Sequence, residues 1–260
     1  MDVRGDNVLD LPVRPDGPTG LGAALRLCLR WIGADGPLSV QEARAFRAVW
    51  LAEDGSHRAT IYDVARGDAA QCDRLLLTAL PRVAAGLGAD WCDGGSSFVD
   101  VTIACARIHE ALRLLGDVAR PAPDGACVVV ASPRGEDHVL PLALLAYRLR
   151  RMGLHARLLS DATAGGVARA FADTGADGIV LGASTDRGFA RAIDIVRALR
   201  RMGGPHRPVA LGGCALSRHR DAARESGADC LSNDLQDALD SFKVTLPGRL
   251  GPACDMGATT

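Results

Sequence analysis

The second half of the chain predicts a doubly wound α/β domain built on a parallel, five-stranded sheet, and the first half predicts an all-α helical bundle. Short runs rich in β-branched residues alternate with helical patterns only in the second half, and a Pro- and Gly-rich segment, GDVARPAPDGA, separates the halves. The predicted organisation is a flexible tail (1–19), a helical bundle (20–116), a linker (117–126), the α/β domain (127–244) and a second flexible tail (245–260).

Apolar side chains recur at helical spacing throughout the first half, which predicts four or five helices. Their expected buried faces are Leu21, Leu25, Cys28, Leu29 and Ile32, then Ala43, Phe46 and Trp50, then Leu76, Leu80, Val83 and Leu87, and finally Val101, Ala104, Cys105, Ile108 and Leu112. Ser39 with Glu42 three residues later predicts a capping box, and Ser97 predicts the N-cap of the last helix.

The second half alternates strands and helices five times, which implies parallel strands joined by right-handed crossovers. The expected strands are 127–132, 155–159, 178–183, 208–213 and a short one near Cys230, and the expected helices are 141–152, 164–174, 187–202, 217–226 and 233–243. The first strand, CVVVAS, has the composition of a strand that is buried on both faces. Gly153 is expected just beyond the end of the first helix, in the C′ position.

Composition and charge exclude several classes of protein. Hydrophobic residues make up 48% of the 260, the net charge is −1, and no long basic run is present, so we expect a globular protein that does not bind nucleic acid directly. Neither a membrane span nor a signal peptide is expected. The eight cysteines include no C-x-x-C pair, which argues against a zinc site and favours reduced thiols in the cytoplasm, with a redox-sensing pair left open.

Three segments are expected at the carboxyl ends of the strands, where open α/β sheets bind their ligands. They contribute the candidate residues Glu136, Asp137 and His138 after the first strand, Ser184 and Thr185 after the third, and Gly212 and Gly213 after the fourth. An imidazole is a good ligand for a transition metal, and Glu136 is placed to accept the other ring N–H of His138. In the third segment, the glycines Gly212 and Gly213 allow a bulky group to approach the backbone.

These segments resemble the cobalamin-binding domain family, which carries D-x-H-x-x-G in the first loop, S-x-L or T-x-L after the third strand and Gly-Gly after the fourth. The matching stretches here are Glu136-Asp-His138-Val-Leu-Pro141, Gly182-Ala-Ser184 and Gly212-Gly213, with 46 residues from His138 to Ser184 and 74 from His138 to Gly212. The resemblance implies that His138 ligates cobalt from below, in place of the cofactor's dimethylbenzimidazole. The displaced nucleotide tail would then lie beside the Ser and Gly-Gly segments. Glutamate for aspartate and Pro141 for glycine are departures.

A second resemblance lies in the stretch LGADWCDGGSSFVDVTIACARIHEALRLLG, which is similar to the AerR/PpaA group of purple photosynthetic bacteria and to the SCHIC region of AppA. It extends the likeness to about residues 70–244 and implies that the bundle caps the upper face of the corrin, with Trp91 as a cap residue. In photoreceptor-type caps the tryptophan is followed nine and ten residues later by Glu-His. Asp100 and Val101 take those places here.

The resemblance implies a cytoplasmic, cobalamin-binding, light-responsive regulator that is not an enzyme and contacts no membrane. It would act as an antirepressor on a partner repressor of the CrtJ/PpsR type. The missing Glu-His pair favours hydroxo- or aquocobalamin over adenosylcobalamin. Two alternatives remain open on the same fold: a haem-binding redox sensor and a corrinoid methyl-transfer shuttle.

Each candidate residue also has a plainer interpretation. His138 could be an ordinary loop histidine, Trp91 a core residue, Ser184 and Thr185 a helix cap, and Gly212-Gly213 a tight turn. His109 is expected on a half-exposed helix face. No partners are evident for His57, His155, His206 and His219, and Arg200, Arg201 and the arginines of 148–151 are expected at solvated helix ends.

Overall fold

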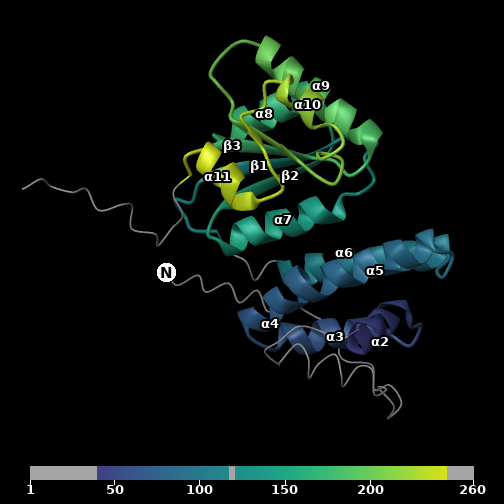
Figure 1. Cartoon of the computed structure of the whole chain (residues 1–260). Helices are drawn as coiled ribbons and strands as arrows, with labels where there is room; N and C mark the ends of the chain where they lie inside the picture. Colours follow the sequence, from purple (N-terminus) through teal and green to yellow (C-terminus); the bar gives the residue numbers. More distant parts are fainter. Residues whose placement is uncertain (1–39, 117–120, 245–260) are drawn as a thin grey trace, which may run out of the picture. The chain divides into compact units, whose positions relative to one another are not determined.

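The computed structural model describes residues 40–116 and 121–244, and the chain divides into two compact units, Met1–Gly116 and Asp117–Thr260 (Figure 1). The two predicted tails, the apolar face from Leu21 to Ile32 and the cap at Ser39 lie outside the described residues. None of the described helices combines the length and the hydropathy that crossing a bilayer requires.

Helices make up the described part of the first unit. They are α2 (Val40–Leu51), α3 (Ser56–Ala65), α4 (Ala69–Asp73), the π-helical segment η1 (Arg74–Ala79), α5 (Leu80–Cys92) and α6 (Phe98–Leu115). The predicted face of Leu76, Leu80, Val83 and Leu87 is buried, together with Phe46 and Trp50. On α6 the buried stripe is Ala104, Ile108, Ala111 and Leu115, whereas the predicted Leu112 is only half-buried.

The predicted N-cap of α6 is confirmed, and it forms a full capping box. The Ser97 hydroxyl accepts a hydrogen bond from the Asp100 N–H at 3.1 Å, and the Asp100 carboxylate accepts one from the Ser97 N–H at 2.8 Å. Hydrogen bonds from Ser97 lower the pKa of Asp100. The carboxylate that stands where the photoreceptor-type caps have glutamate is therefore engaged in starting its own helix.

The second unit has the predicted doubly wound α/β fold. Its elements are β1 (Cys127–Pro133), α7 (Leu140–Arg151), β2 (His155–Ala162), α8 (Ala164–Thr174), β3 (Gly178–Gly182), α9 (Asp186–Arg201), β4 (Val209–Gly212), α10 (Arg220–Arg224), β5 (Cys230–Leu231) and α11 (Leu235–Ser241). All neighbouring strands are parallel, in the order β2-β1-β3-β4-β5. Gly153 follows α7 with φ +84°, as predicted for a C′ glycine.

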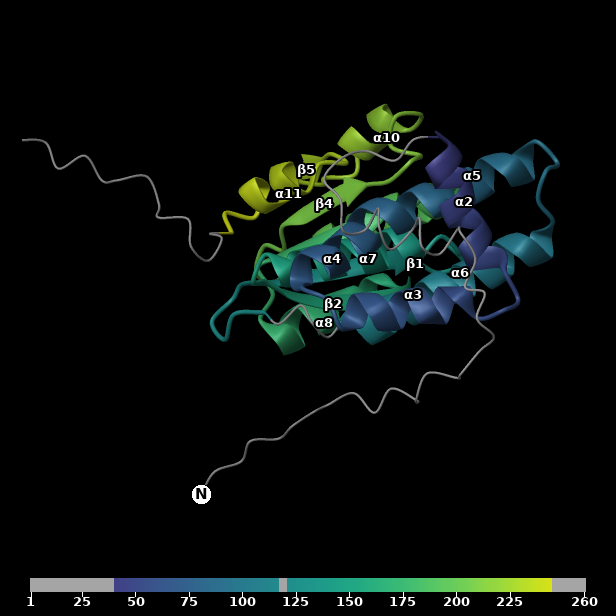
Figure 2. The ribbon, with the colours of Figure 1, turned by 90° about the horizontal axis from the view of Figure 1, so that it is seen from below.

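Alternate residues of the central strands are buried on opposite faces of the sheet. Val128, Val130 and Val180 pack in one core with side chains of α7 and α11. These two helices lie on the same face of the sheet (Figures 1 and 2). Val129, Ile179 and Leu181 pack in the core on the other side, with side chains of α8, α9 and α10. A strand buried on both faces needs a continuous apolar run, which is why these strands lack an alternating pattern.

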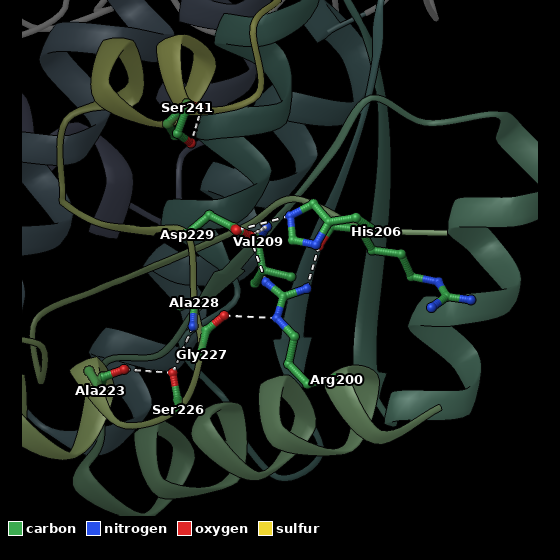
Figure 3. A network of polar contacts seen from close by, with 11 residues as sticks. Arg200, His206, Val209, Ala223, Ser226, Gly227, Ala228, Asp229 and Ser241 are labelled. Atoms are coloured by element: carbon green, nitrogen blue, oxygen red, sulfur yellow. Dashed lines mark hydrogen bonds and ion pairs between the residues drawn. The ribbon is translucent and has the colours of Figure 1, made fainter. Parts of the chain in front are cut away.

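Arg200 corrects part of one prediction: it lies in the last turn of α9, as predicted, but its side chain is only 25% exposed and is hydrogen-bonded to other segments. Its Nε donates to the Gly227 carbonyl at 2.8 Å, one guanidinium N–H donates to the Arg207 carbonyl at 2.8 Å, and another donates to the Asp229 carboxylate at 2.6 Å (Figure 3). The same carboxylate accepts the Val209 N–H at 2.6 Å and contacts His206 Nε2 at 3.0 Å. We call Arg200, His206, Val209 and Asp229 the amino-end centre, because it lies where β4 and β5 begin.

The other histidines that lack an evident partner in the sequence also have one in the structure. His57 contacts Glu110, His155 the Ala122 carbonyl, and His219 the Asp186 carboxylate. The partners of His155 and His219 are more than 30 residues away in the sequence. His57 is on α3, and its partner Glu110 is on α6. Tertiary structure therefore supplies contacts that local sequence does not indicate.

Candidate functional site

The candidate site lies where the strand order reverses, between β1 and β3. At such a switch point the loops that follow the two strands diverge, and a ligand can enter between them. Glu136, in the loop after β1, spans this point. One of its carboxylate oxygens accepts the N–H groups of Ser184 and Thr185, each at 3.0 Å, and the Thr185 hydroxyl at 2.9 Å.

The second carboxylate oxygen of Glu136 holds His138. It accepts the backbone N–H of His138 at 3.1 Å and lies 2.7 Å from ring Nδ1. The hydrogen bond predicted from the sequence is therefore present, and the longer glutamate arm also reaches the β3 loop. Together, these five donors satisfy a carboxylate whose side chain is 0% exposed. We call Glu136, His138, Ser184 and Thr185 the carboxyl-end centre.

The electrostatics of Glu136 are set by burial and by these donors. Burial alone raises the pKa of the carboxyl, but the hydrogen bonds from Thr185 and His138 outweigh it and lower the pKa from 4.5 to about 2. Gly188 permits this packing, because a Cβ there would come within 2.3 Å of the carboxylate. Glu136 is therefore ionised at neutral pH.

The ionised carboxylate determines which nitrogen of His138 carries a proton. A carboxylate can only accept hydrogen bonds, so Nδ1 is the donor and the neutral ring leaves its lone pair on Nε2. The side chain is 59% exposed, and within the described residues Nε2 has no hydrogen-bond partner. An imidazole with Nδ1 held by a carboxylate and Nε2 free is the arrangement found in metal-ligating histidines.

A cavity of about 210 Å³ lies beside this histidine, between the carboxyl ends of β3 and β4 and the helices α7 and α11. His138 is one of its lining residues, and most of the rest are apolar. The apolar side chains of the lining are Pro141, Leu142, Leu145, Val180, Leu181, Ala183, Ala210, Leu235 and Ala238. Polar groups come from Ser184, Ser232, Asn233 and Asp234. The lining of this cavity suits an apolar group that has a polar end.

Ser184 and Thr185 have different surroundings. The Thr185 hydroxyl accepts the Gly188 N–H at 3.0 Å as the N-cap of α9 and donates to Glu136, so its hydrogen-bonding capacity is used within the protein. Ser184 lines the cavity, and its hydroxyl has no partner in the described part of the chain. Of the two, Ser184 is the residue placed to contact a ligand.

Gly212 and Gly213 line the cavity and are also required by the packing of the loops. A Cβ on Gly212 would lie 2.6 Å from the Ser232 carbonyl oxygen. Gly213 has φ +116°, and a Cβ there would lie 2.0 Å from the Ala183 carbonyl oxygen. The contact between neighbouring loops therefore demands glycine at both positions, independently of any ligand.

Two candidates are not brought into this cluster. Asp137 is exposed and does not line the cavity. Trp91 belongs to the helical unit, where it is 52% exposed, so its interpretation as a core residue is wrong. It is one of four exposed apolar side chains around the α5–α6 connection, with Phe98, Val99 and Ile103.

The cavity also contains residues that sequence reasoning missed. Leu142 and Leu145 line it from α7, and the run Ser232-Asn-Asp234 follows the two-residue strand β5. Asn233 accepts the Gly213 N–H at 2.7 Å. Polar residues directly after the last strand were a usable signal, since every carboxyl end of a parallel sheet lies at the same edge.

Comparisons with known proteins bear on the fold. No family model matches the chain. It is 28% identical over 169 residues to a Rhodobacter capsulatus protein named "Uncharacterized 20.5 kDa protein in bchF-crtJ intergenic region", covering 64% of this chain and 88% of that protein.

The solved structures that resemble this chain include the following two. One is the monomethylamine corrinoid protein of Methanosarcina barkeri, with a TM-score of 0.59, 15% identity, and coverage of 79% of this chain and 97% of that one. A cobalamin-binding protein from Desulfitobacterium hafniense DCB-2 matches less well, with a TM-score of 0.40, 18% identity, and coverage of 77% and 93%. The chain thus has the fold seen in the Methanosarcina corrinoid protein.

Proposed function

We propose that this protein binds cobalamin, with His138 as the lower axial ligand of cobalt, and that it acts as a regulator, not as an enzyme. The observation that carries the proposal is the buried, ionised Glu136, which holds Nδ1 of His138 beside an apolar cavity. A single imidazole supplies one axial donor, so the metal must bring its other ligands with it, as a corrin does. The likeness in fold to a corrinoid protein supports the same choice.

The residues of the second unit fit the parts of such a cofactor. The cavity between α7 and α11 would hold the displaced nucleotide tail, with the Ser184 hydroxyl as a polar contact and the lining leucines around the apolar base. Bound cobalamin would supply a cobalt centre whose upper ligand can be exchanged or released by light. Glu136 would keep a proton on Nδ1, and so keep the Nε2 lone pair directed to the metal.

The regulatory part of the proposal rests on different observations. The relative in Rhodobacter capsulatus is named for a position between bchF and crtJ, which suits a partner repressor of the CrtJ/PpsR type. The exposed side chains of Trp91, Phe98, Val99 and Ile103 give the helical unit an apolar surface suited to a corrin face or a partner. Because Asp100 is engaged by Ser97, hydroxo- or aquocobalamin is favoured over adenosylcobalamin.

The test is reconstitution with hydroxocobalamin in the dark, followed by absorption spectroscopy. Wild type is expected to give the corrin spectrum of a histidine-ligated form, and His138→Ala is expected to lose it. His206→Ala is the matched control, since His206 also contacts a carboxylate but lines no described cavity. Unchanged affinity and spectrum in His138→Ala would show that the ligand assignment is wrong.

Light response and partner are tested separately. Illuminated and dark samples are mixed with a CrtJ/PpsR-type repressor and run on size-exclusion chromatography. A shift in co-elution between the two is expected if the protein is a light-responsive antirepressor. Equal co-elution in dark and light would contradict the proposed light response but not the proposed binding of cobalamin.

Two other functions use the same histidine. Imidazole also ligates haem iron, so a haem-binding redox sensor would show a Soret band after incubation with haem and no corrin bands after incubation with cobalamin. Because the fold is similar to that of a monomethylamine corrinoid protein, a methyl-transfer shuttle is a second alternative to be tested. A shuttle would pass the methyl group of bound methylcobalamin to a thiol acceptor, which a regulator would not.

A further inference from the structure

The loop that carries Glu136 and His138 is held on a second side, away from the cavity. The Asp161 carboxylate accepts the Gly135 N–H at 3.0 Å, and a guanidinium N–H of Arg191 donates to the Arg134 carbonyl. Arg134 itself donates its N–H to the Ala162 carbonyl at 3.3 Å. Neither Asp161 nor Arg191 is among the residues that line the cavity.

Asp161 reaches this loop because β2 contains a bulge. Pairing between β1 and β2 runs from Ala131↔Leu159 to Pro133↔Ala162, so the register shifts and β2 has an additional residue there. Asp161 lies in this bulge with φ +51°, a left-handed conformation that is unfavourable for most residues with a Cβ and less so for aspartate and asparagine. Bulges beside functional sites often redirect a side chain, and strained backbone persists where a function requires it.

Arg191 packs against the same turn from α9. Gly135 has φ +72°, and a Cβ there would lie 2.5 Å from the Arg191 guanidinium, so the loop passes directly over this side chain. Residues 134 and 135 are therefore fixed by Asp161 and Arg191, and the next residue, Glu136, is fixed by the β3 loop. His138 lies two residues beyond this doubly held point.

We propose that Asp161 and Arg191 are positioning residues for the His138 ligand. They act through the backbone of residues 134 and 135, which sets where Glu136 begins and therefore where the imidazole stands. The inference deepens the proposed function and rests on it. It assigns a role to two residues that neither touch the cavity nor belong to the loop motif.

The test compares Asp161→Gly, Asp161→Asn, Arg191→Ala and the control Arg197→Ala. Glycine suits the left-handed backbone but lacks the acceptor, whereas asparagine tolerates that backbone and keeps an acceptor oxygen. Arg197 is on the same helix and pairs only with Asp194 in the described structure. Two quantities are measured: amide hydrogen exchange of residues 134–140 without cofactor, and affinity for hydroxocobalamin with the histidine-ligated fraction of the spectrum.

Asp161→Gly and Arg191→Ala are expected to exchange faster at residues 134–140 and to lose affinity by about tenfold, the lower end of the loss when support for a metal ligand is removed. The thermal midpoint of Asp161→Gly should stay near that of wild type, because the change removes backbone strain along with the hydrogen bond. Asp161→Asn and Arg197→Ala should resemble wild type in both measurements.

Unchanged exchange and affinity in Asp161→Gly and Arg191→Ala would overturn the inference, as would faster exchange with no change in the histidine-ligated fraction. If wild type itself does not bind cobalamin, the proposed function fails and this inference fails with it. Hydrogen exchange in the cofactor-free protein distinguishes the two failures, because it tests whether Asp161 and Arg191 hold the loop even when wild type does not bind cobalamin.

Discussion

The two ends of the sheet each pair a carboxylate with a histidine, but they balance the negative charge differently. In the amino-end centre, Asp229 has the Arg200 guanidinium at 2.6 Å, a full positive charge. In the carboxyl-end centre, no arginine or lysine of the described chain forms an ion pair with Glu136. Backbone N–H groups, a hydroxyl and one imidazole surround it instead. The carboxylate at the carboxyl end is therefore stabilised by hydrogen bonds, whereas the one at the amino end also has a cation beside it.

Exposure separates the two centres further. The side chains of Arg200 and Asp229 are 25% and 26% exposed, whereas that of Glu136 is fully buried. Solvent screens a partly exposed pair, so its contribution to stability is small, while a buried charge is costly as soon as one partner is lost. A carboxylate–histidine pair therefore does not by itself identify a functional site. Burial, the source of the neutralising charge and an adjacent cavity do.

The largest difference between the centres should come from neutralising each carboxylate. Glu136→Gln places an amide NH₂ against N–H donors whichever way it is turned, and we expect it to lower the free energy of unfolding by about 3 kcal/mol. Asp229→Asn should cost about 1 kcal/mol, because water can replace the lost contacts. Urea unfolding followed by circular dichroism measures both. Equal losses would mean that burial does not distinguish the two ends.

Acid should act on the carboxyl-end centre through the low pKa of Glu136. The folded pKa of about 2 lies below the reference value of 4.5, so the group contributes stability that is fully present above pH 4.5 and is lost as the pH falls toward 2. By this linkage the loss is roughly 3 kcal/mol. Unfolding free energies measured from pH 6 to pH 2 should therefore fall less steeply in Glu136→Gln. A curve parallel to wild type would contradict the assignment of the shift to Glu136.

The smallest effects are expected at the amino-end centre. Arg200→Ala removes three hydrogen bonds that join α9 to the segments before β4 and β5, and it should cost about 1–2 kcal/mol of unfolding free energy. His206→Ala removes one exposed contact and should cost less than about 1 kcal/mol. Neither should change the spectrum of bound cobalamin. A spectral change in either variant would show that the two ends of the sheet are coupled.

Much of the fold could be predicted from the sequence, because a strand that is buried on both faces requires a continuous apolar run such as CVVVAS. Helix ends were also readable where a local signal exists, as at Ser97 and Gly153. β5 was harder, since two residues form too short a run to carry a pattern. The division of the chain into a helical half and an α/β half required only the change in periodicity.

The sequence indicated which residues would gather at the carboxyl ends of β1, β3 and β4, but not most of their contacts. The hydrogen bond from His138 to Glu136 joins residues two apart, so spacing suggests it. The contacts of Glu136 with Ser184 and Thr185 join residues 48 and 49 apart and depend on β1 and β3 being neighbours. The partners of Arg200 likewise come from segments later in the chain, and this is why the sequence indicated its place at a helix end but not its hydrogen bonds.

The hydroxyl of Thr185 makes two hydrogen bonds. It accepts the Gly188 N–H in the first turn of α9, and it donates to the Glu136 carboxylate that holds the imidazole of His138. A displacement of the first turn of α9 would therefore alter the hydrogen bonds around Glu136, and a displacement of Glu136 would alter the N-cap of α9. Thermodynamic reciprocity makes the two directions equal in free energy. The imidazole of His138 is thus connected to the first turn of α9 through only two groups, the Glu136 carboxylate and the Thr185 hydroxyl.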